Sequence, residues 1–223
     1  MKKFLLAATA LASLSMPSFA ADPYVADPQW YITGFAGYAF AEDYESAFVN
    51  NITGAQVDYN VSMDDGFVIG GALGYIWNPN IRTELELSYG SNEFGNDYRS
   101  AGFVGLGESG SIDSFMVFAN TWFNHSLGWV DPYIGGGVGV AFSHGDLSLT
   151  NGAGNQFSSN ETDLAAQFGA GLRFPVSSNV EIDASYRLRA VFDLEFDSDI
   201  AGFSNKGSDF ITHTAQLGLT YKF

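Results

Sequence analysis

Strict alternation between apolar and polar residues at the end of the chain constrains its fold more than any other feature. In residues 211–223 every second position is mostly apolar, and this row ends on two aromatic residues, whereas the positions between are small or polar. The two rows are Ile211, His213, Ala215, Leu217, Leu219, Tyr221 and Phe223, and Thr212, Thr214, Gln216, Gly218, Thr220 and Lys222. Successive side chains leave a strand on opposite faces, so this period of two predicts a β-strand with one apolar and one polar face.

The same alternation recurs in seven earlier segments, each of roughly 9–12 residues, which is the length that a tilted membrane-spanning strand needs. These predicted strands are 30–40, 67–77, 81–89, 112–123, 132–142, 163–174 and 180–189. The fourth is ambiguous because both of its faces carry aromatic residues. We assign Phe115 and Phe123 to the outward face, and Phe118 and Trp122 to the inward face.

Short and long connections alternate between these strands. Short turns are predicted at 78–80, 124–131 and 175–179, and long polar loops at 41–65, 90–111, 143–162 and 191–209. Because short turns join antiparallel neighbours, the order predicts consecutive hairpins. The fold class is therefore all-β: an eight-stranded antiparallel up-and-down barrel with four long loops at one end and three short turns at the other.

The start of the chain has the anatomy of a secretory signal peptide. Lys2 and Lys3 precede an apolar run, and Ser18-Phe19-Ala20 forms a small-x-small cleavage site. We therefore expect residues 1–20 to be removed and residues 21–223 to form one barrel domain. No later run of about 18 apolar residues predicts a membrane helix.

Composition excludes several classes of partner and site. The formal net charge of the whole chain is −16, and removal of two lysines makes it more negative, so nucleic acid is excluded as a natural partner. The chain has no cysteine, which excludes a disulfide scaffold and a thiolate zinc site.

Aromatic residues at both ends of the apolar rows favour a membrane barrel over a soluble, lipocalin-like barrel, which is the alternative with the apolar rows inside. Lipid requires every backbone polar group to be paired, and a closed barrel achieves this. The predicted interfacial girdle comprises Trp30, Tyr38, Phe40, Tyr75, Trp77 and Tyr89.

The opposite faces of the predicted strands carry charges of both signs, which we interpret as a polar network inside the barrel. Its members are Arg82, Glu84, Glu86, Asn120, Gln167, Arg173, Glu181, Asp183, Arg187 and Arg189. An unpaired buried charge is costly, so we expect ion pairs, with Arg187 as the first choice for Glu84. Side chains fill an eight-stranded barrel, so we expect no general diffusion pore, although the inward glycines predict a narrow wet gap.

Several strands resemble the OmpA-like eight-stranded outer-membrane β-barrel family, particularly its small surface-antigen and porin-family members. The resemblance covers essentially the whole mature chain. The matching pieces are Trp30-Tyr31 with Gly34 and Gly37, residues 84–87 before Tyr89, Asn120, residues 132–135 with Gly137 and Gly139, residues 167–171, Tyr186-Arg187, and His213 with residues 218–223.

The resemblance implies the outer membrane of a Gram-negative cell and contact with lipid and lipopolysaccharide. It also implies that the β-barrel assembly machinery reads Tyr221 and Phe223 as part of the terminal signal. We expect a monomer without a peptidoglycan-binding domain.

The expected role is structural or surface-interactive, in envelope integrity, adhesion or as a surface antigen, and is carried by the acidic loops. The alternatives are a lipid A-modifying enzyme and a small solute channel. His125, His144 and His213 show no nucleophile–base–acid motif, and the alternation points His213 toward lipid. We therefore expect no enzyme and no catalytic, cofactor or metal site.

The acids Asp193, Glu195, Asp197 and Asp199 alternate and are of the type that holds Ca²⁺ or Mg²⁺. They lack the glycine and the closing glutamate of an EF-hand loop, so we expect a solvated acidic rim. Divalent cations are expected only as bridges between the loops and lipopolysaccharide.

Overall fold

The structure is a computed structural model that describes residues 29–42, 44–50, 53–54, 56–100, 103–104, 107–150, 155–194, 203–206 and 208–223. The predicted signal peptide lies outside these residues. No helix among them is long and apolar enough to cross a membrane.

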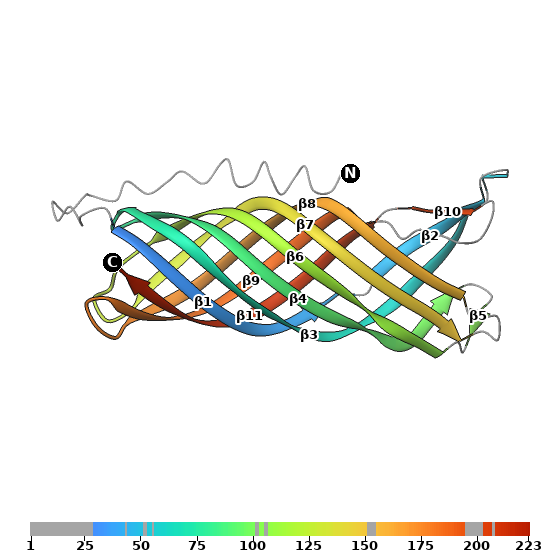
Figure 1. The fold of residues 1–223 in the computed structure, drawn as a ribbon, viewed down its shortest axis with the longest axis horizontal. Coiled ribbons are helices and arrows are strands. Elements are labelled where there is room, and N and C mark those ends of the chain that lie inside the picture. The colour runs from blue at the N-terminus through green and yellow to red at the C-terminus, as the bar shows by residue number, and fades with distance from the viewer. Residues whose placement is uncertain are drawn as a thin grey trace.

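Eight long strands form a closed antiparallel barrel, as the alternation predicts (Figure 1). They are β1 (Gln29–Ala41), β3 (Gln56–Asn78), β4 (Ile81–Ser100), β6 (Gly107–Asn124), β7 (Asp131–Thr150), β8 (Asn155–Pro175), β9 (Val180–Leu194) and β11 (Ser208–Lys222). Each pairs with the next, and β1 closes the ring by pairing with both β3 and β11. Closure leaves no open edge within the wall, which suits a barrel surrounded by lipid.

The three short turns gather at the end of the barrel where the chain finishes (Figure 1). The side chain of Asn78 accepts hydrogen bonds from the backbone nitrogens of Asn80 and Ile81, which fixes the first turn. In the second turn Gly128 has a φ of +90°, a conformation that glycine adopts without strain. The backbone nitrogen of Phe223 donates to the carbonyl of Trp30, so the chain end is tied to the first strand.

At the opposite end the strands extend well into the predicted loops, so the predicted loop bounds are wrong. The barrel strands β4 and β7 continue to Ser100 and Thr150, and β3 and β8 begin at Gln56 and Asn155. Three short strands also lie there: β2 (Tyr44–Asn50), β5 (Phe103–Val104) and β10 (Phe203–Lys206). Beyond the membrane water solvates both faces of a ladder, so the alternation that reveals a strand inside the membrane is lost.

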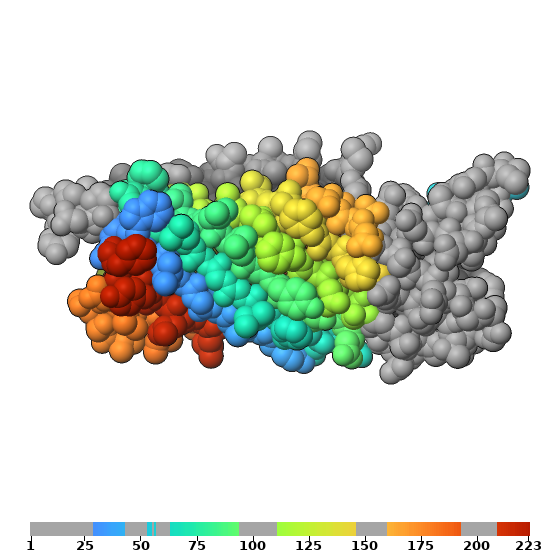
Figure 2. All heavy atoms as spheres, in the orientation of Figure 1, coloured from blue at the N-terminus to red at the C-terminus, as the bar shows by residue number. Residues whose placement is uncertain are grey.

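The outward side chains of the wall are mostly apolar. In the space-filling view the coloured strands of the wall pack side by side on the visible face (Figure 2). On the ambiguous strand β6, Phe115 and Phe123 are exposed, whereas Phe118 and Trp122 are fully buried, as predicted. The inward row therefore carries the large aromatic side chains that fill the barrel.

The ladders separate at the long-loop end. Pairing between β8 and β9 ends at Ala165 opposite Val191, and pairing between β4 and β6 ends at Glu93 opposite Ser111. The strands β6, β7 and β8 remain paired with one another beyond these points. They form a three-stranded sheet that projects from one side of the barrel.

Candidate functional site

The ten predicted polar residues all lie inside the barrel, where each is at most 6% exposed. Strand β4 points three of them inward at alternate positions: Arg82, Glu84 and Glu86. The charged members comprise four arginines and four carboxylates. This balance matches the requirement that buried charges be paired.

Glu84 is the centre of the cluster nearer the short turns. Tyr31 donates its hydroxyl to one carboxylate oxygen at 2.6 Å, and the indole nitrogen of Trp122 donates to the other at 2.7 Å. The guanidinium groups of Arg82 and Arg173 lie 3.3 Å and 3.4 Å from Glu84. The predicted first pairing of Glu84 with Arg187 is therefore wrong.

Arg173 connects Glu84 to the acids of β9. It pairs with Glu181 at 3.2 Å and with Asp183 at 3.4 Å. Lys222 reaches Glu181 at 2.8 Å from the closing strand. The network thus ties β4, β8, β9 and β11 together across the interior.

Glu86 forms a second cluster further from the turns. Arg187 and Arg189 donate to it at 2.7 Å and 2.8 Å. Asn120 and Gln167 also donate to it, at 2.9 Å and 3.0 Å. Glu86 thus accepts from four donors, and its one negative charge is shared by two guanidinium groups.

Aromatic rings fill the space that the inward glycines leave. A Cβ atom at Gly74 would lie 2.1 Å from the ring of Tyr31, and one at Gly171 would lie 2.6 Å from the ring of Tyr133. The guanidinium of Arg82 lies 4.2 Å from the centre of the Tyr133 ring. At these positions the predicted wet gap is wrong, because the glycines accommodate rings.

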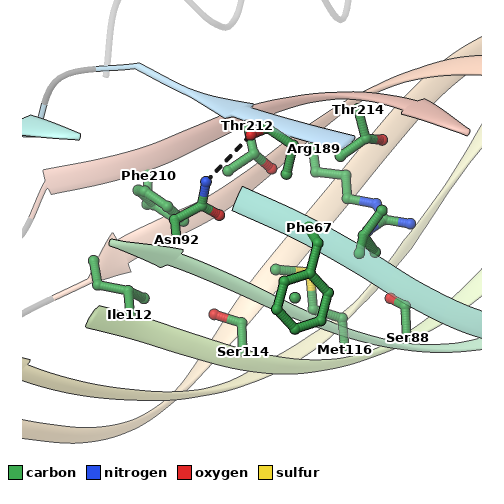
Figure 3. A pocket seen from close by; sticks show the side chains of 13 residues that line it. Phe67, Ser88, Asn92, Ile112, Ser114, Met116, Arg189, Phe210, Thr212 and Thr214 are labelled. Atoms are coloured by element: carbon green, nitrogen blue, oxygen red, sulfur yellow. Dashed lines mark hydrogen bonds between the residues drawn. The ribbon is translucent and has the colours of Figure 1, made fainter. Parts of the chain in front are cut away.

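The interior becomes largely apolar toward the long-loop end. A buried cluster there comprises Met63, Ile112, Met116, Phe118, Ala141, Ala165, Val191 and Phe210. Beside it is a cavity of about 20 Å³, with Ser88, Ser114 and Thr214 among its lining residues (Figure 3). A water molecule needs about 10–15 Å³, so the cavity has room for little more than a single water.

Asn92 is a buried residue that lines this cavity and links β4 to neighbouring strands. Its side-chain nitrogen donates to the carbonyls of Ala39 and Asp64, where β1 stops pairing with β3. A Cβ atom at Gly66 would lie 1.9 Å from the carbonyl oxygen of Ser91, so this position has room only for glycine.

The predicted girdle residues face outward at two levels of the wall. Near the short turns Tyr75 packs edge-on against both Trp30 and Trp77. Near the long loops Tyr38 packs against Phe40, and Tyr89 lies near Phe67. The hydroxyls of Tyr38 and Tyr89 donate to Asp65 and Asp113, which lie just beyond the apolar band. The rings of Tyr221 and Phe223 stack on each other at the short-turn end of the wall. Their role as an assembly signal stays a prediction.

One outward cluster was missed by sequence reasoning. His213 contacts the hydroxyl of Tyr186 through Nδ1 and lies 3.1 Å from the carboxylate of Glu42 through Nε2. An ionised carboxylate can only accept a hydrogen bond, so Nε2 of His213 donates to Glu42. The alternation showed that His213 faces outward, but only the strand register shows which residues surround it. His144 instead contacts Asn160, and His125 lies in a short turn.

No cluster of three or more metal-ligating side chains occurs in the part of the chain that the structure describes. Of the four alternating acids singled out in the sequence, Asp193 lies at the end of β9, and the other three lie outside the described residues.

Comparison with known proteins supports the architecture. Residues 6–223 match the family model of the outer membrane protein beta-barrel domain. The structure of OprG from Pseudomonas aeruginosa is similar, with a TM-score of 0.57, 14% identity, and coverage of 89% of this chain and 97% of that one. This likeness shows the fold alone.

Two further solved structures are similar at lower scores. Neisserial surface protein A has a TM-score of 0.47 and 17% identity, with coverage of 87% of this chain and 97% of that one. Ail, the attachment invasion locus protein of Yersinia pestis, has a TM-score of 0.41 and 22% identity, with coverage of 87% and 99%. No curated protein sequence matches the chain.

Proposed function

Because the chain belongs to the outer membrane protein beta-barrel domain family and lies in the outer membrane, we propose that it binds partners outside the cell through the long-loop end of its barrel. The distribution of charge carries this proposal. Residues 41–65, 90–113, 143–163 and 191–209 contain 18 of the 25 acidic residues and two of the nine basic residues. The interior network is balanced, so the net negative charge of the molecule is concentrated at this end.

A concentrated charge of one sign raises the rate at which oppositely charged partners associate, and salt weakens the effect. The partner class that fits is therefore cationic. The hydrogen-bonded sheet of β6, β7 and β8 supplies a surface outside the membrane for such contacts. The long-loop end thus combines a binding surface with electrostatic steering.

The filled interior argues against the alternative of a solute channel. The ionic clusters of Glu84 and Glu86 occupy one half, and the apolar cluster around Phe118 occupies the other. Single-channel recordings in planar bilayers should show no conductance steps, and regular steps would favour the channel.

The proposed role is tested on whole cells that produce the protein. Cells should adhere to a lysine-coated surface more than to a neutral one, and salt should reduce the difference. A variant with asparagine or glutamine in place of the acids of residues 41–65 should adhere less while reaching the surface in equal amount. Equal adhesion of the two forms would overturn the proposal.

A second candidate, modification of an outer-leaflet lipid, is favoured by the outward cluster of Glu42, His213 and Tyr186. A histidine oriented by a carboxylate and in contact with a hydroxyl is the arrangement of an activated base. Mass spectrometry of lipid A from cells with the wild-type protein and with His213→Ala decides this candidate. Identical lipid A excludes it.

A further inference from the structure

The second short turn differs from the other two because its tip is apolar. The first turn consists of Asn78-Pro79-Asn80, and the third, after Val176, has Ser177-Ser178-Asn179 at its tip. The second carries Leu127-Gly128-Trp129, and 54% of Leu127 and 74% of Trp129 are exposed. Turns that face water are built mainly from small and polar residues. An apolar tip therefore indicates a surrounding other than water.

This turn is an ordered continuation of the hairpin of β6 and β7. The backbone nitrogen of His125 donates to the carbonyl of Pro132, and that of Leu127 donates to the carbonyl of Val130. Both pairs keep the register in which β6 faces β7 along the wall. Two residues remain as the hairpin loop, and the first of them needs the positive φ that Gly128 has.

The lipid-facing wall continues onto the turn. Side chains an even number of residues apart on a strand share a face. Leu127 therefore extends the outward row of β6 from Phe123, and Val130 extends that of β7 from Ile134. Val130 is buried although it stands at the edge of the wall, so the outward face is closely packed down to the loop.

The depth of the turn follows from the height of the apolar band on β6. The band begins at Phe115, because the next outward residue, Asp113, is a carboxylate that accepts from a tyrosine hydroxyl. A band about 25 Å tall takes up about 9–11 residues of a strand tilted by about 35–45°, so it ends shortly before Leu127. Each headgroup layer is about 5–7 Å thick, which is about two or three residues of such a strand. Leu127 and Trp129 therefore lie at the level of the headgroups.

We propose that this turn is a membrane anchor that inserts Leu127 and Trp129 among the phospholipid headgroups of the inner leaflet. The short turns of outer-membrane barrels lie on the periplasmic side. An indole ring combines apolar faces with one N–H donor, so tryptophan favours the boundary between lipid and water. Phospholipid is the occupant that the geometry supports, because the lipid-facing wall runs onto the turn without a break.

The anchor goes beyond the proposed function and differs from the aromatic girdle. It acts at the end of the barrel opposite the acidic loops. The predicted girdle residues lie on strands, whereas Trp129 lies at the tip of a turn. Contact with the inner leaflet fixes the height of the hairpin of β6 and β7 in the bilayer.

The first experiment places a nitroxide label on the barrel folded into vesicles of phosphatidylethanolamine and phosphatidylglycerol. The chain has no cysteine, so one introduced cysteine takes the label alone. Leu127→Cys is the test variant, and Ser178→Cys, at the exposed tip of the third turn, is the matched control. Electron paramagnetic resonance compares collisions with oxygen, which dissolves in the bilayer, and with a nickel chelate, which stays in water. The oxygen-to-nickel ratio should be several-fold higher for Leu127→Cys than for Ser178→Cys.

The second experiment measures what the contact contributes to folding into the same vesicles. Leu127→Ser combined with Trp129→Ser should lower the folding equilibrium constant by at least about tenfold, because two largely exposed side chains lose their contact with lipid. Trp129→Phe, which keeps an aromatic ring, should retain most of the stability. Heat-modifiable gel mobility verifies that each variant folds.

Equal oxygen-to-nickel ratios for the two labelled variants would overturn the anchor, because the tip would then lie in water and be available to a periplasmic protein instead. An unchanged folding equilibrium constant in the double serine variant would also overturn it. Neither result bears on adhesion at the long-loop end, which the whole-cell assay decides independently.

Discussion

Glu86 shows how a single carboxylate organises the interior. It accepts from two arginines, an asparagine and a glutamine, and it is fully buried. Glu86→Gln keeps the shape of the side chain but leaves Arg187 and Arg189 without their common counter-charge. Breaking a buried pair in this way should lower the free energy of unfolding by about 3–5 kcal/mol. Urea titration of the protein folded in lipid vesicles measures the loss.

The control for this prediction is Glu93→Gln, because Glu93 is exposed at the outer rim and its removal should change stability by no more than about 0.5 kcal/mol. Combining Glu86→Gln with Arg189→Gln should cost less than the sum of the two single changes, since the double variant removes both charges of the pair. Strictly additive losses would contradict the pairing.

Two glycines of the wall, Gly74 facing inward and Gly34 facing outward, provide a second prediction at the residue scale. Gly74→Ala would place a methyl group 2.1 Å from the ring of Tyr31, whereas a Cβ atom at Gly34 meets no atom within 4 Å. Overpacking of this kind costs about 1–3 kcal/mol, so Gly74→Ala should destabilise the barrel. Gly34→Ala should be neutral or should stabilise it by about 0.5–1 kcal/mol. Unfolding midpoints of the two variants compare them, and equal midpoints would contradict the packing described.

At the scale of the strand, the closing element β11 tests which face meets lipid. Leu217 faces outward with 67% of its surface exposed, about midway between the aromatic boundaries at Tyr221 and His213. Leu217→Arg should therefore cost about 2–4 kcal/mol in the folding equilibrium in lipid. Leu217→Ala, which keeps the site apolar, should cost clearly less. Similar small losses for both changes would contradict the lipid-facing assignment.

The strands within the membrane were predictable because one face meets lipid and the other meets the packed interior. The inward and outward rows of β4 and β6 follow directly from this period of two. The partner of Glu84 was not predictable in the same way. Which inward side chains meet across the barrel depends on strand tilt and stagger, and these place Arg173 against Glu84 and Arg187 against Glu86.

The strand extensions beyond the membrane were missed for a related physical reason. Residues 155–162 belong to β8, yet their sequence is polar at both parities apart from Phe157. Where water solvates both faces of a strand, neither face has to be apolar, so the sequence shows no alternation. Only the strand pairing in the structure reveals these extensions. In the same way, the contact between Glu42 and His213 follows from the register of β1 on β11, which the sequence does not show.

At the scale of the whole molecule, the wall, the interior and the long-loop end carry different kinds of charge. The wall is apolar, the interior network balances four arginines against four carboxylates, and the long-loop end is acidic. We propose that this end contacts lipopolysaccharide, which is itself anionic, so like charges meet at the membrane surface. Screening acts only beyond about 8 Å at physiological salt, which leaves repulsion between nearest neighbours largely intact.

Divalent cations that bridge these carboxylates to lipid phosphates relieve the repulsion. Millimolar Mg²⁺ or Ca²⁺ should therefore slow protease cleavage within residues 41–65 and 143–162 on intact cells, and a chelator should reverse the effect. The unfolding temperature of the barrel itself should not move, because its interior network is buried and neutral overall. A variant with asparagine at Asp64 and Asp65 should respond less to chelation than the wild type. Cleavage that is unchanged by the chelator would contradict the bridging, and a shift in barrel unfolding would place the cations at the wall rather than at the loops.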